Sequence, residues 1–251
     1  AVSAWKQAGA TRWALRVNPS SGNLHPTEAY ALIPAGAVDS SALLVHYAPD
    51  AHALEVRGEL PASLAEQLHN ALPATGLLVG LSSIAWREAW KYGERAYRYC
   101  NHDLGHALAA LAIAANIQGW QVRRLHAVAE WQLDTMLGLD RQGFAEAEHA
   151  DCLLWIGPGQ STEFALPASV LQGLAGLELA GTPNRLSRQY RDWPELQRIQ
   201  ALCRAPALAR QSWQTGAGRM QADNPGLPLR PILPRRRSAQ SRDGKTAIQA
   251  G

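Results

Sequence analysis

The feature that most constrains the fold of this chain is the polar segment from Arg16 to Pro26, whose sequence is Arg-Val-Asn-Pro-Ser-Ser-Gly-Asn-Leu-His-Pro. Pro19 fixes its own φ and biases Asn18 toward an extended backbone, so the segment is stiff. Two prolines, two hydroxyls, a glycine and amide side chains leave no apolar pattern that could form a core element. We therefore expect a rigid turn at the protein surface.

This turn carries a row of hydrogen-bonding groups. Ser20, Ser21 and Asn23 offer donors and acceptors in close succession, and Gly22 permits the close approach of a flat ligand. The residues alone indicate either a cradle for a small molecule or a polar turn without a ligand, and their spacing does not separate the two.

A second dense stretch lies downstream and has the sequence Trp-Arg-Glu-Ala-Trp-Lys-Tyr-Gly-Glu-Arg-Ala-Tyr-Arg-Tyr over residues 86–99, followed by Asp-Leu-Gly-His at 103–106. The first motif, Pro-Ser-x-x-Asn-x-His-Pro, resembles the flavin-contacting turn of the nitroreductase family, whose members bind FMN. The second is similar to the signature of the SagB-type, or azoline, dehydrogenases, which aromatise thiazolines and oxazolines in modified peptides. Together the motifs and the segments between them cover roughly residues 3 to 200.

The resemblance implies that seven residues of the turn bind FMN. His25 occupies a position where glutamine is commoner in the wider family, and its imidazole could still form a hydrogen bond with a flavin edge. The implied cofactor-binding residues are Arg16, Pro19, Ser20, Ser21, Gly22, Asn23 and His25.

In the azoline dehydrogenases that this chain resembles, an adjacent Lys-Tyr pair is associated with catalysis. Lys91 and Tyr92 match this pair. The implied mechanism has Lys91 removing a proton next to the ring nitrogen while a hydride passes to flavin N5, with Tyr92 orienting the ring or sharing the proton. A lysine acts as a base only where burial or nearby cations favour its neutral form. From the residues alone, a solvated lysine and a tyrosine packed at an edge is the alternative interpretation.

The family resemblance predicts an α+β fold: a nitroreductase-like three-layer α-β-α sandwich with a central, mostly antiparallel sheet. Apolar periodicity predicts helices over 5–8, 64–72, 104–117 and 130–137. It predicts strands over 28–33, 43–47, 53–57, 76–84, 121–128 and 151–156, the fourth of them buried on both faces. In the helix over 104–117 we expect His106 to be a satisfied core histidine, and the many alanines suit core burial or a dimer interface.

We expect three parts along the chain: a flavin module over 1–200, a linker over 201–231, and over 232–251 either the start of a second module or a basic tail. Members of the family usually begin with Arg-Arg-Ser-x-Arg, whose guanidinium and hydroxyl groups grip the flavin phosphate. No such motif precedes Trp5, but Arg236, Arg237 and Ser238 open a stretch that resembles it. The chain is therefore expected to be a piece of a tandem protein, or alternatively a permuted one in which this arm completes a flavin site.

The composition of the chain limits which other kinds of site and partner we expect. The three cysteines, Cys100, Cys152 and Cys203, show no metal-ligand or redox spacing, which favours free thiols in a reducing cytoplasm and no metal site. We expect no membrane span, because the longest apolar run is interrupted, and no nucleic-acid partner, because the basic run near residue 236 has little lysine and no interleaved aromatic residues.

Three functions remain as hypotheses. The first is an FMN-dependent oxidoreductase of the azoline-dehydrogenase type, acting on a small molecule or an azoline-containing peptide, as a homodimer or as an intramolecular tandem pseudo-dimer. The second is a generic nitro- or quinone-reducing flavoprotein that takes its hydride from NAD(P)H. The third is a flavin-free module that docks a peptide or a partner subunit.

Overall fold

The structure is a computed structural model of the chain and describes residues 2–73, 75–141, 146–159, 164–182, 185, 190–204 and 206, without the side chains of residues 2–6 and 13–15. The chain divides into two units, Ala1–Ser212 and Trp213–Gly251, and all described residues belong to the first. The predicted phosphate-binding residues Arg236, Arg237 and Ser238, and the whole segment over 232–251, lie outside the described residues.

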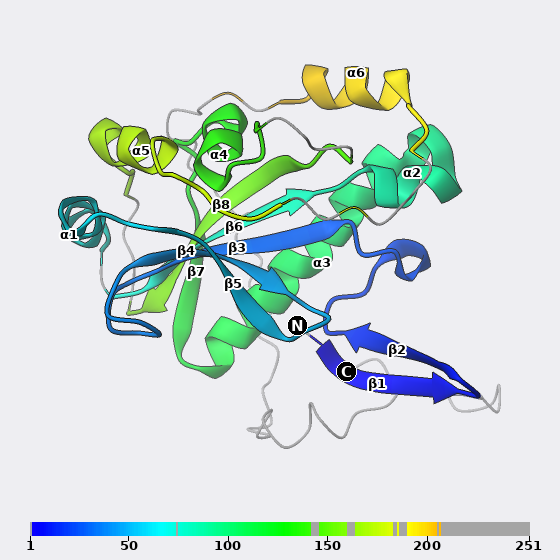
Figure 1. Cartoon of the computed structure of the whole chain (residues 1–251), viewed down its shortest axis with the longest axis horizontal. Coiled ribbons are helices and arrows are strands. Elements are labelled where there is room, and N and C mark those ends of the chain that lie inside the picture. The colour runs from blue at the N-terminus through cyan, green and yellow to red at the C-terminus, as the bar shows by residue number, and fades with distance from the viewer. Residues whose placement is uncertain are drawn as a thin grey trace, which may run out of the picture. The chain divides into compact units, whose positions relative to one another are not determined.

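The first unit is built on a six-stranded sheet in which every neighbouring pair is antiparallel (Figure 1). The strand order is β5-β4-β3-β6-β8-β7. The strands are β3 (Thr27–Ile33), β4 (Leu43–Ala48), β5 (Ala53–Glu59), β6 (Leu77–Ser83), β7 (Trp120–Arg124) and β8 (His149–Pro158). The predicted strands are thereby confirmed, with β7 ending four residues earlier than expected.

Helices cover both faces of this sheet. On one face lie α1 (Ala62–Ala71), α4 (Glu130–Leu137) and α5 (Ala168–Ala175), and on the other lies the long α3 (Ala96–Ile117) (Figure 1). Alternate residues of the central strands supply the two cores: Leu78 and Leu153 face α1, α4 and α5, whereas Val79 and Leu154 face α3. The predicted three-layer α-β-α sandwich is confirmed, and β6 is buried on both faces as its continuous apolar sequence predicted.

A third apolar cluster joins the helices at one end of the sheet. It brings together α2 (Trp86–Tyr92), the start of α3 and α6 (Pro194–Leu202) through Ala89, Cys100 and Leu196. The single turn η2 (Gly93–Arg95) links α2 to α3, and Gly93 adopts a φ of +59°, a backbone conformation that L side chains rarely adopt. The second sequence motif therefore forms a helical corner at the end of β6.

The predicted helix over 5–8 is wrong, because residues 2–16 form a separate antiparallel hairpin. Strands β1 (Val2–Ala8) and β2 (Thr11–Arg16) pair from Ala8 with Thr11 outward. Gly9, interpreted as a helix terminator, instead takes the first position of the two-residue loop with a φ of +58°. A glycine at the end of a short apolar run is compatible with the end of a helix and with the loop of a hairpin. The pairing of β1 with β2 determines that the hairpin forms.

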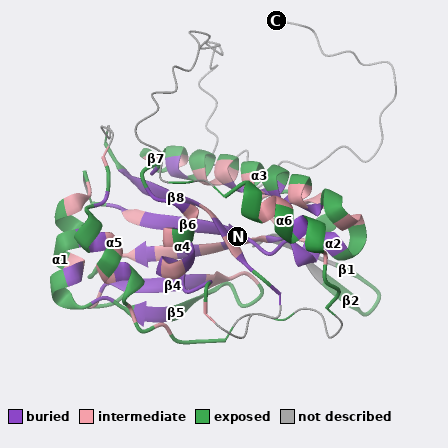
Figure 2. Cartoon of the chain, turned by 90° about the horizontal axis from the view of Figure 1, so that it is seen from above, coloured by how far each residue is buried: buried purple, intermediate pink, exposed green. Residues whose placement is uncertain are grey.

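The prediction that His106 is a core histidine is also wrong. Helix α3 carries both buried and exposed residues (Figure 2). Its buried residues include Asp103, Ala107 and Ala115, whereas His106 is exposed. Among the exposed residues of this helix is Ile113, with 54% of its surface accessible. The small residues on one side of α3 thus pack against the sheet, and those on the other side form an open, exposed face.

Within the described residues, none of the helices combines the length and the apolar character that crossing a bilayer requires. The same residues contain no group of three or more histidine, cysteine or acidic side chains arranged to hold a metal ion.

Trp155 on β8 is fully buried in the core and has its ring 6.1 Å from that of Phe164. A Cβ at Gly157 would overlap the Trp155 ring and lie 3.0 Å from the carbonyl oxygen of Thr75. We expect Gly157→Ala to lower the free energy of unfolding by about 1–3 kcal/mol, because the close-packed ring cannot move aside without strain.

The matched control is Gly105→Ala on the exposed side of α3, where a Cβ meets nothing within 4 Å. This substitution should leave stability unchanged or raise it by up to about 1 kcal/mol, since alanine favours a helix interior over glycine. Urea unfolding of both variants measures the two values, and equal stabilities would contradict the packing described here.

Candidate functional site

The predicted turn is a surface segment with an unusual backbone. It contains a single helical turn, η1 (Ser21–Asn23), and leads directly into β3. Gly22, Asn23 and His25 adopt φ values of +61°, +62° and +51°. Two non-glycine residues with positive φ in three positions constitute stored strain, which persists only where the surrounding structure holds the chain in place.

One residue that holds this turn is Asp103 on α3, whose side chain is completely buried. Its carboxylate accepts a hydrogen bond from the Ser20 hydroxyl, a second from the Ser21 backbone N–H at 3.1 Å and a long third from the Ser21 hydroxyl at 3.5 Å. The Ser20 oxygen also accepts a hydrogen bond from the His25 N–H at 2.8 Å. Both serine hydroxyl protons therefore serve the protein's own structure, and a ligand could use only the remaining oxygen lone pairs.

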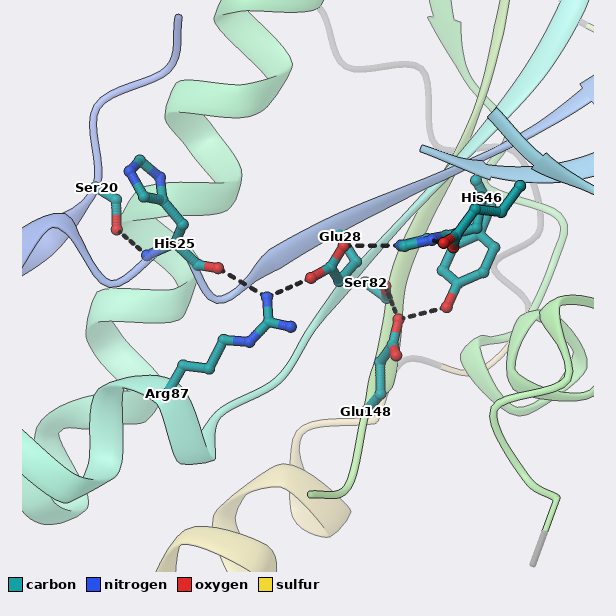
Figure 3. Close-up of polar contacts among 9 residues, drawn as sticks. Ser20, His25, Glu28, His46, Ser82, Arg87 and Glu148 are labelled. Carbon is teal, nitrogen blue, oxygen red and sulfur yellow. Dashed lines mark hydrogen bonds and ion pairs between the residues drawn. The ribbon is translucent and has the colours of Figure 1, made fainter. Parts of the chain in front are cut away.

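A second support comes from Arg87 on α2, which is buried together with its partners (Figure 3). The Arg87 Nη1 donates to the His25 carbonyl oxygen at 3.0 Å and forms an ion pair with Glu28 on β3. The other oxygen of Glu28 lies 2.8 Å from Nε2 of His46, and Nδ1 of His46 lies 2.8 Å from Glu55 at the sheet edge. A chain of polar contacts therefore runs from the turn through three neighbouring strands.

The charges within this network stabilise one another. Burial alone would raise the pKa of Glu28, but the hydrogen bond from His46 and the charge of Arg87 outweigh it and lower the pKa. Burial would lower the pKa of His46, and its two carboxylate partners outweigh that effect and raise it. His46 thus favours the imidazolium form, in which both ring nitrogens donate.

Glu148, which directly precedes β8, forms a separate polar contact with β3 and β6. It accepts hydrogen bonds from the Tyr30 hydroxyl at 2.9 Å and the Ser82 hydroxyl at 2.6 Å (Figure 3). Burial and the nearby Glu28 charge raise the pKa of Glu148. This carboxyl group therefore favours its neutral form more than Glu28 does.

His25 stays neutral at physiological pH. Burial, together with the positive charges of Arg16 and Arg87, lowers the pKa of its ring to about 4. Its Nε2 lies 2.9 Å from the Asn23 side-chain oxygen, whereas Nδ1 is buried without a partner in the described structure. An unpartnered ring nitrogen in the turn is a group that a ligand could satisfy.

The Lys-Tyr pair lies against this turn, although 69 positions separate Gly22 from Lys91 in the sequence. A Cβ built at Gly22 would lie 2.7 Å from the Tyr92 hydroxyl oxygen and 2.9 Å from the Lys91 Nζ. The ring of Tyr92 contacts that of Tyr99 at 4.5 Å, and the Lys91 Nζ lies 5.3 Å from the Tyr92 ring centroid. The structure therefore brings the two sequence motifs together at Gly22, whose positive φ favours glycine.

The exposure of these groups differs. Gly22, Asn23 and Lys91 are exposed, and Tyr92 and Arg16 are half-buried. The side chain of Arg16, at the end of β2, makes no hydrogen bond or ion pair with the described part of the chain, and burial lowers its pKa. Two cations, an amide, a phenol and a side-chain-free backbone position thus border one surface.

This arrangement fits FMN in its chemistry. A flat ring system needs a close backbone approach, which Gly22 provides, and its polar edge needs donors and acceptors such as Asn23 and the unpartnered His25 nitrogen. Arg16 and Lys91 are cations that an anionic ligand group can approach. The residues predicted at the turn therefore lie where they could contact such a ligand, with the serine hydroxyl protons already engaged.

A cavity of about 410 Å³ lies at the other end of β3, between that strand and α1. Leu32, Leu60 and Leu68 line it, with Glu59 and His69 among its polar residues. None of the predicted site residues borders this cavity.

Sequence reasoning did not identify the residues that hold the site together. Asp103 and Arg87 stand inside the second motif, so the motif itself was the available signal, although it gave neither residue a role. Glu28 is the first residue of the predicted strand over 28–33 and was not singled out. Burial of a charged group cannot be recognised from one sequence, because exposed and buried carboxylates have the same local pattern.

No protein-family model matches the chain, and the search of curated proteins gives no match. The solved structures that are similar to it include two proteins classed as nitroreductases and one microcin synthetase complex. A protein classed as a nitroreductase from Anabaena variabilis has 21% sequence identity and a TM-score of 0.55, covering 84% of this chain and 42% of its own. This chain thus spans less than half the length of that protein.

The second similar structure is the Escherichia coli microcin synthetase McbBCD complex with truncated pro-MccB17 bound, at 17% identity and a TM-score of 0.48, covering 64% of this chain and 61% of its own. The third is a protein classed as a nitroreductase from Ralstonia eutropha, at 17% identity and a TM-score of 0.43, covering 59% of this chain and 64% of its own. Of the three, the first alone exceeds a TM-score of 0.5, and at its identity it establishes a nitroreductase-like fold and nothing more.

We expect Asp103→Asn to destabilise the protein by about 2 kcal/mol, because hydrogen bonds to a charged acceptor are worth about 1.5–3 kcal/mol and the amide would turn a donor toward the serine hydroxyls. Urea unfolding measures the loss, and amide hydrogen exchange at Ser21 should accelerate. As a control, Asp50→Asn in an exposed turn should change stability by less than about 0.5 kcal/mol. Equal stability of both variants would mean that Asp103 does not hold the turn.

Proposed function

We propose that this chain is a module of an FMN-dependent oxidoreductase of the azoline-dehydrogenase type. The observation that carries the proposal is the contact of Gly22 with Lys91 and Tyr92, since it unites the flavin-type turn with the Lys-Tyr pair. The nitroreductase-like fold is consistent with it. The substrate class we propose is a small molecule or peptide carrying a thiazoline or oxazoline ring.

The turn and its neighbours would hold the cofactor. Asn23, His25 and the Gly22 backbone would contact the ring system or ribityl chain, with Pro19, Ser20 and Ser21 giving the turn its shape. Arg16 would approach an anionic group, and Arg236, Arg237 and Ser238 are proposed to grip the phosphate. Bound FMN would supply a two-electron acceptor for a substrate hydride, which no protein side chain can provide.

Lys91 is proposed as the base that takes the substrate proton. Its side chain is exposed in the chain alone, so bound cofactor and substrate would have to cover it for the lysine to act as a base. The Tyr92 hydroxyl beside it would orient the substrate ring or share the proton, and the Tyr99 ring keeps Tyr92 in place. Proton removal and hydride loss from adjacent ring atoms together give the aromatic product.

The exposure of Lys91 also favours a second candidate, a generic reductase of nitro compounds or quinones. Such an enzyme receives its hydride from NAD(P)H and needs no base, so an exposed lysine would serve only to attract an anionic substrate. The two candidates share the flavin site and differ in whether Lys91 takes part in the hydride step.

A homodimer, or an equivalent pairing of modules within one longer chain, belongs to the proposal. The open face of α3 carries Gly105, Ala109, Ala112 and Ile113, all exposed in this chain. Small residues let a second helix approach closely, and Ile113 supplies apolar surface to bury. Sedimentation at micromolar concentration tests this part of the proposal.

The test of function is stopped-flow reduction of bound flavin by an azoline substrate. Lys91→Ala should still bind FMN but reduce the rate of flavin reduction about 10²- to 10⁴-fold, which is the usual contribution of a general base. Lys91→Arg is the matched control for charge, because a guanidinium keeps the cation yet cannot act as a base. Tyr92→Phe should have a milder effect, since it loses only the hydroxyl.

Near-normal reduction by Lys91→Ala would remove the azoline-dehydrogenase mechanism and leave the generic reductase, which NAD(P)H as hydride donor would then identify. Failure of the parent protein to bind FMN under any condition would instead favour the docking module.

A further inference from the structure

Glu88 on α2 is a buried carboxyl group that neither the fold nor the proposed mechanism uses. It is 0% exposed, and both of its side-chain oxygens are buried without a hydrogen-bond partner in the described structure. A carboxylate in such a position would lose its hydration without compensation, which strongly disfavours the charged form. A group of this kind remains in a folded protein either as a neutral acid or as part of a site.

The charged surroundings of Glu88 come from two helices. From α3 the ionisable groups facing it are Asp103 and the buried thiol of Cys100, and on α2 itself Lys91 follows one turn later. Helix α6 packs against this cluster through Leu196. Glu88 therefore shares its electrostatic environment with the carboxylate that holds the turn and with the lysine proposed as the base.

Two buried carboxyl groups on adjoining helices do not readily ionise together. Asp103 accepts three hydrogen bonds from Ser20 and Ser21, whereas Glu88 accepts none. Hydrogen bonds to the charged form favour ionisation, so the negative charge belongs on Asp103 and the proton on Glu88. The difference between the two environments fixes which of the two carries the charge.

We propose that Glu88 is a positioning residue that works as a neutral carboxylic acid. While Glu88 carries its proton, Asp103 is the charged member of this pair of carboxyl groups, and it keeps Ser20 and Ser21 in the arrangement that admits FMN. When Glu88 ionises, a second negative charge in the same buried cluster competes with this arrangement and weakens the turn.

The direction of the pH dependence follows from the pKa of Glu88. Burial, followed by the Asp103 charge, raises this pKa from 4.5 to about 7, and Lys91 opposes the rise. The folded protein thus keeps a proton that the unfolded chain releases, so this residue's contribution to stability is present at acidic pH and falls as pH rises through about 7. The hydrogen bonds that hold Ser20 and Ser21 to Asp103 should weaken over the same pH range.

The first measurement needs no cofactor. The amide proton of Ser21 donates to Asp103, so its NMR chemical shift reports the state of that contact. In the unmodified chain this shift should titrate with an apparent pKa near 7, and in Glu88→Gln, which imitates the protonated acid, the titration should disappear. A Ser21 shift that is constant from pH 6 to pH 8 in the unmodified chain overturns the proposal without any variant.

The second measurement rests on the proposed function and uses FMN itself. FMN should bind the unmodified protein about fivefold or more weakly at pH 8 than at pH 6, the lower end of typical coupling between two sites, and Glu88→Gln should bind equally at both. The control Asp151→Asn removes another carboxyl whose pKa burial raises to about 7, but which accepts its hydrogen bond from Ser83. It should keep the pH dependence of FMN binding.

The outcomes separate the two ideas. A Ser21 titration that depends on Glu88, without FMN binding at any pH, would support the role of Glu88 in the turn and contradict the flavin function. FMN binding whose pH dependence survives in Glu88→Gln would overturn the proposal for Glu88 and leave the flavin function intact.

Discussion

The site depends on the hydrogen bonds between the Asp103 carboxylate and the Ser20–Ser21 turn. A turn with three positive φ values in four residues is strained and would relax in isolation. Asp103 holds it from α3, and Arg87 holds its far end through the His25 carbonyl. Because both anchors belong to the helical corner after β6, that corner also sets where Lys91 and Tyr92 meet Gly22.

The polar groups whose burial is energetically unfavourable lie behind the site, inside the protein. Asp103, Glu28, Arg87 and Glu88 are all buried, and the first three are stabilised by charged or multiple hydrogen-bonding partners. Removing one partner from such a group leaves an uncompensated buried charge. The surface residues of the turn can therefore face a ligand, while the buried residues behind them keep the turn in its conformation.

The sequence predicted much of the fold because local patterns were strong. The continuous apolar run of β6, the hairpin of β4 and β5 and the periodic α4 all appear where expected. The predictions failed where tertiary pairing decided between equal local choices, as in the β1–β2 hairpin, and where one face of α3 stayed open and exposed His106. The meeting of the two motifs at Gly22 is a long-range contact, which a single sequence does not contain, and the roles of Asp103 and Glu88 depend on burial in the same way.

The central claim is that the turn and the Lys-Tyr pair form one flavin site. The most direct measurement is an NMR titration of the chain with FMN that follows backbone amide resonances. If the two motifs form one flavin site, the resonances of Ser21–Asn23 and of Lys91–Gly93 should shift together, saturably and with a single dissociation constant. Shifts at neither segment, at one segment without the other, or instead around the cavity between β3 and α1 would contradict it.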